Sequence, residues 1–284
     1  MTRTQHSANW ALRRYALVVV SAIVLALVAL FPGATFTGTT PHSAEAKLAV
    51  FSASGATPAD IQGAVDGCIN SLGPNNADGG SRRINWDGVP DGNSSPNNLP
   101  PNFFNTTVPR GALFPFPGTG VQVSFSSCPT AEFGNINPAY PGIFQTFTPP
   151  KLFTGIDSNV VETQFFDVGT SNPGVSDGMG VVFTDVDLPF STKLKFIDAD
   201  GKSLGTFDVP AGPDGGLSFL CVTGFKIRAD GHGAPNIVRI ISGNVAPSAV
   251  ALDGGGADVV VMDDFIFGDP QPFTDDGDHD DGDD

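Results

Sequence analysis

Residues 259–267 read VVVMDDFIF, a run in which only Asp263 and Asp264 are not apolar. Successive side chains of a β-strand point to opposite faces. On that alternation both faces are apolar: one carries Val259, Val261, Phe265 and Phe267, and the other carries Val260, Met262 and Ile266. Such a strand belongs in the middle of a sheet that is covered on both sides. We therefore expect an opposing sheet on one face and a helix on the other.

Six further segments of the second half have the character of strands. Each is short, rich in Val, Ile or Phe, and bounded by Gly, Pro, Asn or Asp. They are residues 160–166, 180–186, 193–198, 203–209, 217–222 and 236–242, followed by the last strand at 258–267. Residues 193–197 alternate charged and apolar side chains, which predicts a hairpin with 203–207. Regularly spaced strands without intervening helices predict an all-β fold, an antiparallel β-sandwich.

One segment of the first half carries the signals of a helix. Thr57 is a typical N-cap, Pro58 suits the first helical position, and Asp60 falls in the first turn. Apolar residues then recur at helical spacing up to Leu72, which predicts one short N-terminal amphipathic helix. Residues 75–150 are dense in Pro, Gly and Asn but also in Phe. That content of Phe favours long, ordered Pro/Asn-rich loops over disorder.

The N-terminus predicts export. Arg13 and Arg14 precede an apolar run at 15–31, and Pro32 follows it, as in a secretory signal. Ala44-Glu45-Ala46 matches a cleavage pattern. We therefore expect a signal peptide at 1–46, a single β-sandwich domain at 47–270 and a disordered acidic tail at 271–284. The mature protein would be secreted and soluble; retention of the signal as a membrane anchor is the alternative.

Charge and residue content argue against several classes of function. From residue 47 onward, 11 Lys or Arg face 29 Asp or Glu, a formal charge of −18. Such a chain should be repelled by nucleic acid and by anionic membranes. The only histidines in this region are His232 and His279, and no GxSxG motif is present. We expect a protein that is not an enzyme, with a carboxylate-based polysaccharide hydrolase or lyase as the remaining catalytic alternative.

Three cysteines are an odd number for a disulfide framework. Export makes a disulfide chemically feasible. Cys68 with Cys128 is the one pairing that the sequence suggests. Cys221 lies in an apolar strand and is interpreted as a small buried side chain.

Aspartates in apolar strands suggest a metal site. Asp185 and Asp187 are two residues apart, so on a strand both would leave the same face. A buried carboxylate without a partner costs several kcal/mol, and Asp263 or Asp264 would be such a group. Calcium held by these four side chains meets that demand, because it prefers oxygen ligands. An arginine partner, such as Arg239 or Arg110, meets it equally well.

Trp86 and Asp87 are the candidate ligand-binding residues. An exposed Trp can stack on a sugar ring, and Asp87 beside it could bind hydroxyl groups. A buried Trp86 that anchors the preceding helix is the alternative. This would be the only Trp after the signal, so support for a sugar platform is limited to one residue.

The segment VVVMDDFIFG at 259–268 is similar to the final strand of galactose-binding-like jelly rolls, including many carbohydrate-binding modules. The runs FTDVD at 183–187 and FIDADG at 196–201 extend the similarity. The chain also resembles a group of uncharacterised secreted bacterial proteins through RRINWDGVPD at 82–91 and EFGNINP at 132–138. The first resemblance implies a jelly roll and, in some modules, a structural calcium bound by an aspartate at the position of Asp263 or Asp264.

Together these features predict a secreted, non-catalytic β-sandwich. We expect it to bind a polysaccharide or another component of a cell surface or matrix, with calcium as a structural ion. A carbohydrate-binding module is the alternative.

Overall fold

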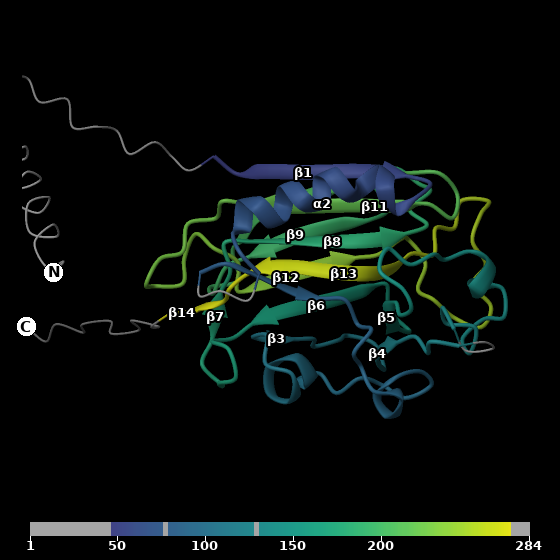
Figure 1. The fold of residues 1–284 in the computed structure, drawn as a ribbon, viewed down its shortest axis with the longest axis horizontal. Coiled ribbons are helices and arrows are strands. Elements are labelled where there is room, and N and C mark those ends of the chain that lie inside the picture. The colour runs from purple at the N-terminus through teal and green to yellow at the C-terminus, as the bar shows by residue number, and fades with distance from the viewer. Residues whose placement is uncertain (1–46, 76–78, 128–130, 274–284) are drawn as a thin grey trace, which may run out of the picture. The chain divides into compact units, whose positions relative to one another are not determined.

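Strand β13 (Val261–Gly268) lies in the middle of the larger of the two main sheets (Figure 1). The computed structural model describes residues 47–75, 79–127 and 131–273. Seven strands form this sheet, in the order β1-β11-β8-β13-β5-β4, and β2 pairs with the second half of β13. They are β1 (Ala49–Gly55), β2 (Ser81–Ile84), β4 (Gly120–Val123), β5 (Phe153–Ile156), β8 (Gly178–Thr184), β11 (Leu217–Thr223) and β13.

A five-stranded sheet packs on one face of the larger sheet. Its order is β10-β9-β12-β6-β3, formed by β10 (Ser203–Asp208), β9 (Lys193–Ile197), β12 (Ile237–Ile241), β6 (Val160–Phe165) and β3 (Ala112–Leu113). Phe183 and Phe265 of the larger sheet share one buried apolar cluster with Phe196 and Val238 of the smaller. All strand pairings within both sheets are antiparallel. The predicted all-β antiparallel sandwich is therefore confirmed.

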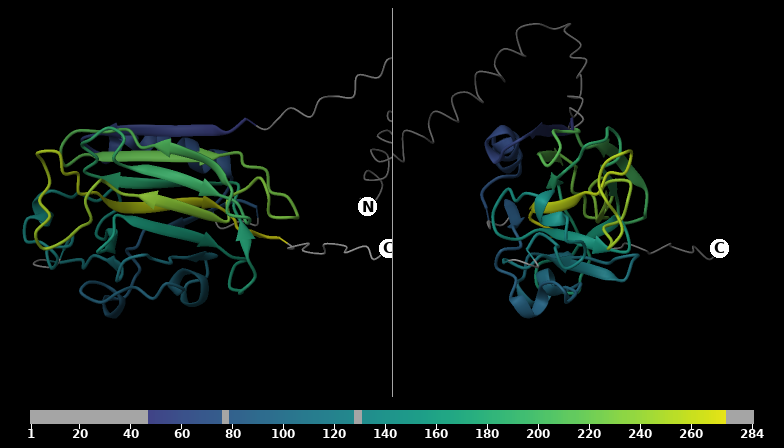
Figure 2. Two further views of the ribbon diagram at one scale, coloured as in Figure 1. Left: turned by 180° about the vertical axis from the view of Figure 1, so that it is seen from behind. Right: turned by 90° about the vertical axis from the view of Figure 1, so that its right-hand side faces the viewer.

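Helix α2 (Pro58–Leu72) covers the other face of the seven-stranded sheet, as the edge-on view of Figure 2 shows. Ile61, Val65 and Leu72 on its buried stripe form a second cluster with Phe219 and Ile266. Thr57, the predicted N-cap, and Asp60, the predicted acid of the first turn, form a capping box at its start. None of the helices in the described part of the chain combines the length and the apolarity that a membrane span requires.

The second apolar face of β13 is covered by α2 as predicted. The prediction that side chains alternate regularly along the whole strand is wrong. A β-bulge shifts the register between Met262 and Phe265. Met262 therefore shares the inner cluster with Phe265 instead of opposing it, while Ile266 faces α2. A bulge places an extra residue in one strand, which reverses the faces beyond it. Asp263 and Asp264 are the two residues of β13 that lie at the bulge, opposite a single residue of β8.

The cysteine prediction is also wrong. Cys68 of α2 is bonded to Cys221 of β11, so it is not available to Cys128, which lies outside the described residues. Both partners are fully buried. The interpretation of Cys221 as buried was correct, but its side chain points outward from the sandwich to the helix. The disulfide therefore fastens α2 to the sheet.

The Pro/Asn-rich region forms ordered loops with little regular structure, as expected. It holds β2, β3, β4 and three short helices: η1 (Asp91–Asn93), η2 (Phe103–Thr107) and η3 (Tyr140–Gly142). A small two-stranded sheet joins β7 (Gly174–Val175) to β14 (Gln271–Pro272). Strand pairing thus continues two residues beyond the predicted domain end at Pro270. The predicted signal and most of the predicted acidic tail lie outside the described residues.

Candidate metal centre

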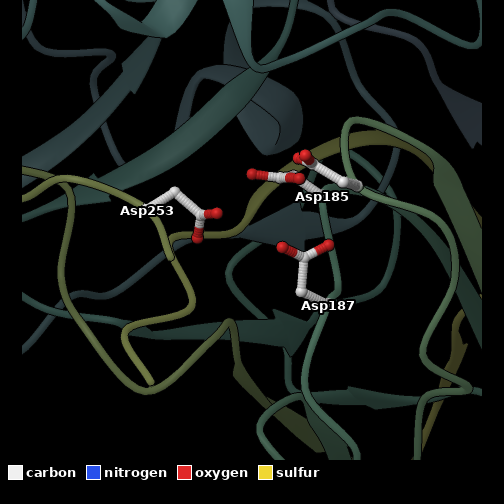
Figure 3. A group of neighbouring side chains, drawn as sticks. Asp185, Asp187 and Asp253 are labelled. Carbon is white, nitrogen blue, oxygen red and sulfur yellow. The ribbon is translucent and has the colours of Figure 1, made fainter. Parts of the chain in front are cut away.

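Four aspartates from three loops meet at one end of the sandwich. Asp185 and Asp187 follow β8, Asp214 lies between β10 and β11, and Asp253 lies between β12 and β13. One carboxylate oxygen from each of the four lies within 4.8 Å of the others. Figure 3 shows Asp185, Asp187 and Asp253 with their carboxylates turned toward one another. We call these four residues the aspartate cluster.

Asp185 and Asp187 converge for a reason that differs from the prediction. Strand β8 ends at Thr184, and Asp185 has a φ of 69°, in the left-handed region that few residues other than glycine adopt. The pair therefore does not lie on a strand with a shared face. The left-handed residue turns the chain at the end of the sheet, and this turn brings both carboxylates to the cluster.

Backbone hydrogen bonds hold the first two loops together. Asp185 donates its N–H to the carbonyl of Gly216 at 2.8 Å, and Gly215 donates its N–H to Asp185 Oδ1 at 2.7 Å. The Gln145 side chain donates to the Gly215 carbonyl at 2.5 Å. Asp185 is therefore fixed in place by the loop that carries Asp214.

The loop that carries Asp253 is anchored on its own side. The Tyr140 hydroxyl contacts the Ser248 carbonyl at 3.1 Å and the Ala251 carbonyl at 3.2 Å, and it accepts the Ser248 N–H at 3.0 Å. The Val259 N–H donates to Asp253 Oδ1 at 3.0 Å. The loop that carries Asp253 is thus held by hydrogen bonds on both sides of this residue, to Tyr140 before it and from Val259 after it.

The cluster is electrostatically costly when it holds no cation. Burial, followed by the charges of Asp253 and Asp187, raises the pKa of Asp185 to about 7. Burial and the charges of Asp253 and Asp214 raise the pKa of Asp187 to about 6. Asp258, a buried neighbour that accepts the Asp187 N–H at 3.2 Å, also has a raised pKa because of burial. These shifts favour neutral side chains or a positive partner.

Two oxygens of the cluster have no hydrogen-bond partner among the described residues. They are Asp185 Oδ2 and Asp187 Oδ1, and both are buried. Asp185 is 0% exposed as a whole residue. A buried carboxylate oxygen without a donor is unfavourable, and a cation removes that cost. With oxygen ligands only, the donor set fits a hard divalent ion such as calcium.

Asp263 and Asp264 lie elsewhere; the protein provides donors for both oxygens of Asp264 and for one of Asp263, whose buried Oδ1 has no partner among the described residues. Arg83 binds Asp264 with two guanidinium nitrogens, Nε at 2.7 Å and Nη2, and the Thr148 hydroxyl donates to it at 2.6 Å. Asp263 Oδ2 accepts the N–H groups of Phe147 at 2.6 Å and Thr148 at 3.0 Å. The sequence predicted either calcium or an arginine as the partner of these aspartates. The structure shows an arginine at Asp264, but it is Arg83.

Neither predicted arginine serves this purpose. Arg239 is bound to Glu162 on the smaller sheet. Burial and the charge of Asp264 raise the pKa of Asp263 well above its ordinary value, which favours its neutral form. The bulge of β13 thus ties β2 to the loop at 147–148 through Arg83, Phe147 and Thr148.

Trp86 is not a sugar platform. Its side chain is 1% exposed and stacks on Phe153 with ring centroids 4.0 Å apart. The ring lies in the core between the sheets rather than against α2, so its predicted role as an anchor for the helix is also wrong. Asp87 is half-buried and accepts the Lys151 N–H at 3.1 Å, and burial raises its pKa to about 6. It holds a loop in place.

Sequence reasoning missed Asp214 and Asp253. Each precedes a glycine, and Asp-Gly is a common turn signal that also occurs at Asp200 and Asp230. Nothing in the local sequence separates the two cluster members from the two ordinary turns. Only the spatial arrangement of the loops does so.

No protein-family model matches this chain, and no curated protein matches it. Solved structures with some similarity include a glycoside hydrolase family 43 arabinoxylan arabinofuranohydrolase from Bacillus subtilis in complex with cellotetraose. Its TM-score is 0.25 and its identity 14%, over 53% of this chain and 24% of that one. Another is the enzymatically active domain of tailspike protein 4 from bacteriophage CBA120, with a TM-score of 0.27 and 10% identity, over 60% of this chain and 20% of that one. The chain spans about a quarter or less of either structure, and similarity at this level carries no argument about function.

Proposed function

We propose that this protein is a secreted, non-catalytic β-sandwich module that binds a component of a cell surface or matrix. Calcium bound by the aspartate cluster stabilises one end of the sandwich. Asp185, Asp187, Asp214 and Asp253 are the ligands, and the ion replaces the missing partners of Asp185 and Asp187. The polysaccharide or other surface component is bound elsewhere on the module.

The observation that carries the proposal is the buried Asp185 Oδ2, which has no donor among the described residues and faces three more carboxylates. Without a cation, a hydrogen-bond donor, a basic side chain or protonation of the carboxyl group would have to offset this cost. Asp264 shows what that solution looks like in the same protein, because Arg83 reaches it directly. Among the described residues, no basic side chain forms an ion pair with Asp185, and its one donor, the Gly215 N–H, contacts Oδ1.

The size of the cluster supports calcium. Calcium binds oxygens at about 2.3–2.6 Å, so ligands on opposite sides of the ion are about 4.6–5.2 Å apart. The four oxygens lie within 4.8 Å of one another, so a single calcium ion could contact all four. Magnesium would need a tighter shell of about 4.0–4.2 Å across. Water or carbonyl oxygens would complete the six to eight ligands of calcium.

The disulfide supports the secreted location. Cys68–Cys221 is a buried structural bond, and bonds of this kind persist in oxidising compartments outside the cytosol. The proposal for export still depends on the sequence of the first 46 residues.

Calcium titration and thermal melting test the metal site. At a free calcium concentration about a hundredfold above Kd, binding adds about 2.7 kcal/mol to the free energy of unfolding. For a domain of this size the melting temperature should rise by about 5–10 °C relative to protein in EDTA. Isothermal titration calorimetry should give one site per chain.

Asp185→Asn should abolish the calcium-dependent rise, because it removes the buried charge that the ion neutralises. In EDTA this variant should melt at or above the temperature of the wild type, since the buried side chain at position 185 no longer carries a charge. Asp66→Asn is the matched control, because Asp66 is exposed on α2, away from the cluster. An unchanged melting temperature of the wild type in EDTA and calcium would exclude the metal site.

A further inference from the structure

The outer face of the five-stranded sheet carries a groove of about 650 Å³. This is the face turned away from the core, because Val161, Leu194, Val238 and Ile240 point inward and are fully buried. The groove lies over β6 and β12, so it is separate from the loops of the aspartate cluster. Its volume falls within the range typical of pockets for small organic ligands.

Apolar and charged side chains are combined in the groove. Val160 and Ile241, which are cross-strand partners, form an apolar floor, and Phe116 between two prolines forms a wall. Glu162 and Arg239 lie in the same groove and are joined at 2.7 Å. Apolar surface next to fixed charged groups suits a sugar, whose ring has apolar C–H faces and hydroxyl edges.

The sheet also places two positive charges side by side. Lys195 of β9 lies directly opposite Arg239 of β12, and both point to the outer face. Like charges directly opposite each other destabilise a sheet. Glu162 pairs with Arg239, but no ion pair joins Lys195 to a carboxylate of the described residues. With Lys193 paired to Asp208, this face carries one positive charge in excess.

That excess stands out on a chain with a formal net charge of −16. An anion between Lys195 and Arg239 would relieve their repulsion, and it would be attracted to this face rather than to the acidic remainder. A sugar ring that packs on Phe116 and Ile241 places its substituents beside Arg239. The complementary ligand is therefore a saccharide that carries carboxylate groups.

We infer that the outer face of the five-stranded sheet is a binding site for acidic polysaccharides of the uronate type. A uronate carboxylate bridges Lys195 and Arg239, and the ring lies on the floor formed by Val160 and Ile241 against Phe116. Glu162 accepts hydrogen bonds from hydroxyl groups, and the Ser158 hydroxyl accepts or donates them. The inference names the ligand class of the proposed binding module but does not require the calcium site.

Calorimetry with tetragalacturonate tests this site. The matched neutral probe is fully methyl-esterified tetragalacturonate, which keeps the rings and loses the charges. Both titrations are made in EDTA, because uronates themselves bind calcium. The acid should bind to the wild type, and the ester should bind at least about tenfold more weakly, since a charge-assisted hydrogen bond contributes at least that factor. Added salt should weaken binding of the acid.

Lys195→Ala should weaken binding of the acid about tenfold or more and leave the ester unaffected, whereas Lys195→Arg should retain binding. The melting temperature of Lys195→Ala should equal or exceed that of the wild type, because a repulsive pair is removed. Lys226→Ala is the matched control, since Lys226 is exposed outside this sheet.

Three results would overturn the inference: no binding of the acid by the wild type, equal binding of acid and ester, or equal effects of Lys195→Ala and Lys226→Ala. Asp185→Asn, titrated in parallel, separates this site from the metal site. Its affinity for the acid should equal that of the wild type, even if calcium does not bind to the protein.

Discussion

Asp185 and Asp264 are both fully buried carboxylates, yet their surroundings differ. Arg83 and Thr148 surround Asp264 with donors, so its charge is neutralised by the protein. Asp185 receives one backbone N–H and otherwise faces acidic side chains. A buried charge is tolerated only with a partner. At the scale of the residue, this contrast separates a structural ion pair from a proposed metal ligand.

The pKa of Asp185 predicts how stability depends on pH. Its value in the folded protein is about 7, against an ordinary value of 3.8. The unfolded chain therefore loses this proton first as the pH rises, and the free energy of unfolding falls between about pH 4 and pH 7. In EDTA the protein should melt at a higher temperature at about pH 5 than at about pH 7.5.

Saturating calcium should reduce this decline, because the ion stabilises the charged carboxylates at the higher pH. Asp185→Asn in EDTA should show a smaller decline than the wild type, with the remainder arising from the other aspartates whose pKa values are raised, among them Asp187, Asp258 and Asp263. A melting temperature that rises from pH 5 to pH 7.5 in EDTA would contradict the prediction.

Strand β13 shows how one element organises its neighbours. Before the bulge its Met262 pairs with Phe153 of β5, and after it Phe265 to Gly268 pair with β2. One edge of the strand therefore serves two partners, and the acidic bulge residues lie where they change. The other face of the sheet is closed by α2, which the disulfide fastens to β11.

Removing that disulfide should lower the free energy of unfolding by about 2–5 kcal/mol, since it closes a long loop of the unfolded chain. The sequence separation of the two cysteines is 153 residues. Chemical denaturation of Cys68→Ala/Cys221→Ala beside the wild type measures the loss. A reducing agent should destabilise the wild type and leave the double variant unchanged. Equal stability of wild type and variant would show that α2 is held by its apolar stripe alone.

At the scale of the whole molecule, an acidic surface and a surface with excess positive charge lie on different parts of the sandwich. One end of the sandwich gathers the loops after β8, between β10 and β11, and between β12 and β13, with their acidic side chains. The outer face of the smaller sheet carries the groove and the excess positive charge. A sandwich can keep such sites apart because its sheet faces and its loop ends are formed by different residues.

Calcium should therefore protect one end of the molecule selectively. Amide hydrogen exchange should slow for Gly215 and Val259, whose N–H groups donate to ligands of the proposed site. With free calcium about a hundredfold above Kd, the slowing should approach a hundredfold where exchange requires opening of the site. Amides of α2 that exchange through local opening are the internal control and should not change. Uniform slowing of every amide would indicate global stabilisation without local ordering.

Much of the fold could be predicted because strand and helix signals are local. The hairpin of β9 and β10 follows from alternation at 193–197, and α2 follows from its cap and stripe. Strands β1 and β5 were missed; β5 (FTGI) contains a glycine that weakens the local signal. The bulge in β13 was missed because alternation assumes a regular ladder, and an extra residue has no local signature beyond the two aspartates.

Only two of the four aspartates of the candidate site could be predicted from the sequence. Asp185 and Asp187 stood out because they follow a buried strand, whereas Asp214 and Asp253 resemble ordinary turn residues. Trp86 was misplaced because the sequence does not show whether an aromatic ring is exposed; four buried Phe rings surround this one.

The amino-acid sequence alone determined the class of fold, the positions of most strands and of α2, and the need to neutralise acidic groups in apolar surroundings. These properties depend on side-chain periodicity and on neighbours a few residues apart. The tertiary structure decided which groups provide the neutralisation, since Arg83 lies 181 residues from Asp264 and Cys68 lies 153 residues from Cys221. Contacts over such separations are set by how the sheets and loops pack, and no local pattern encodes them.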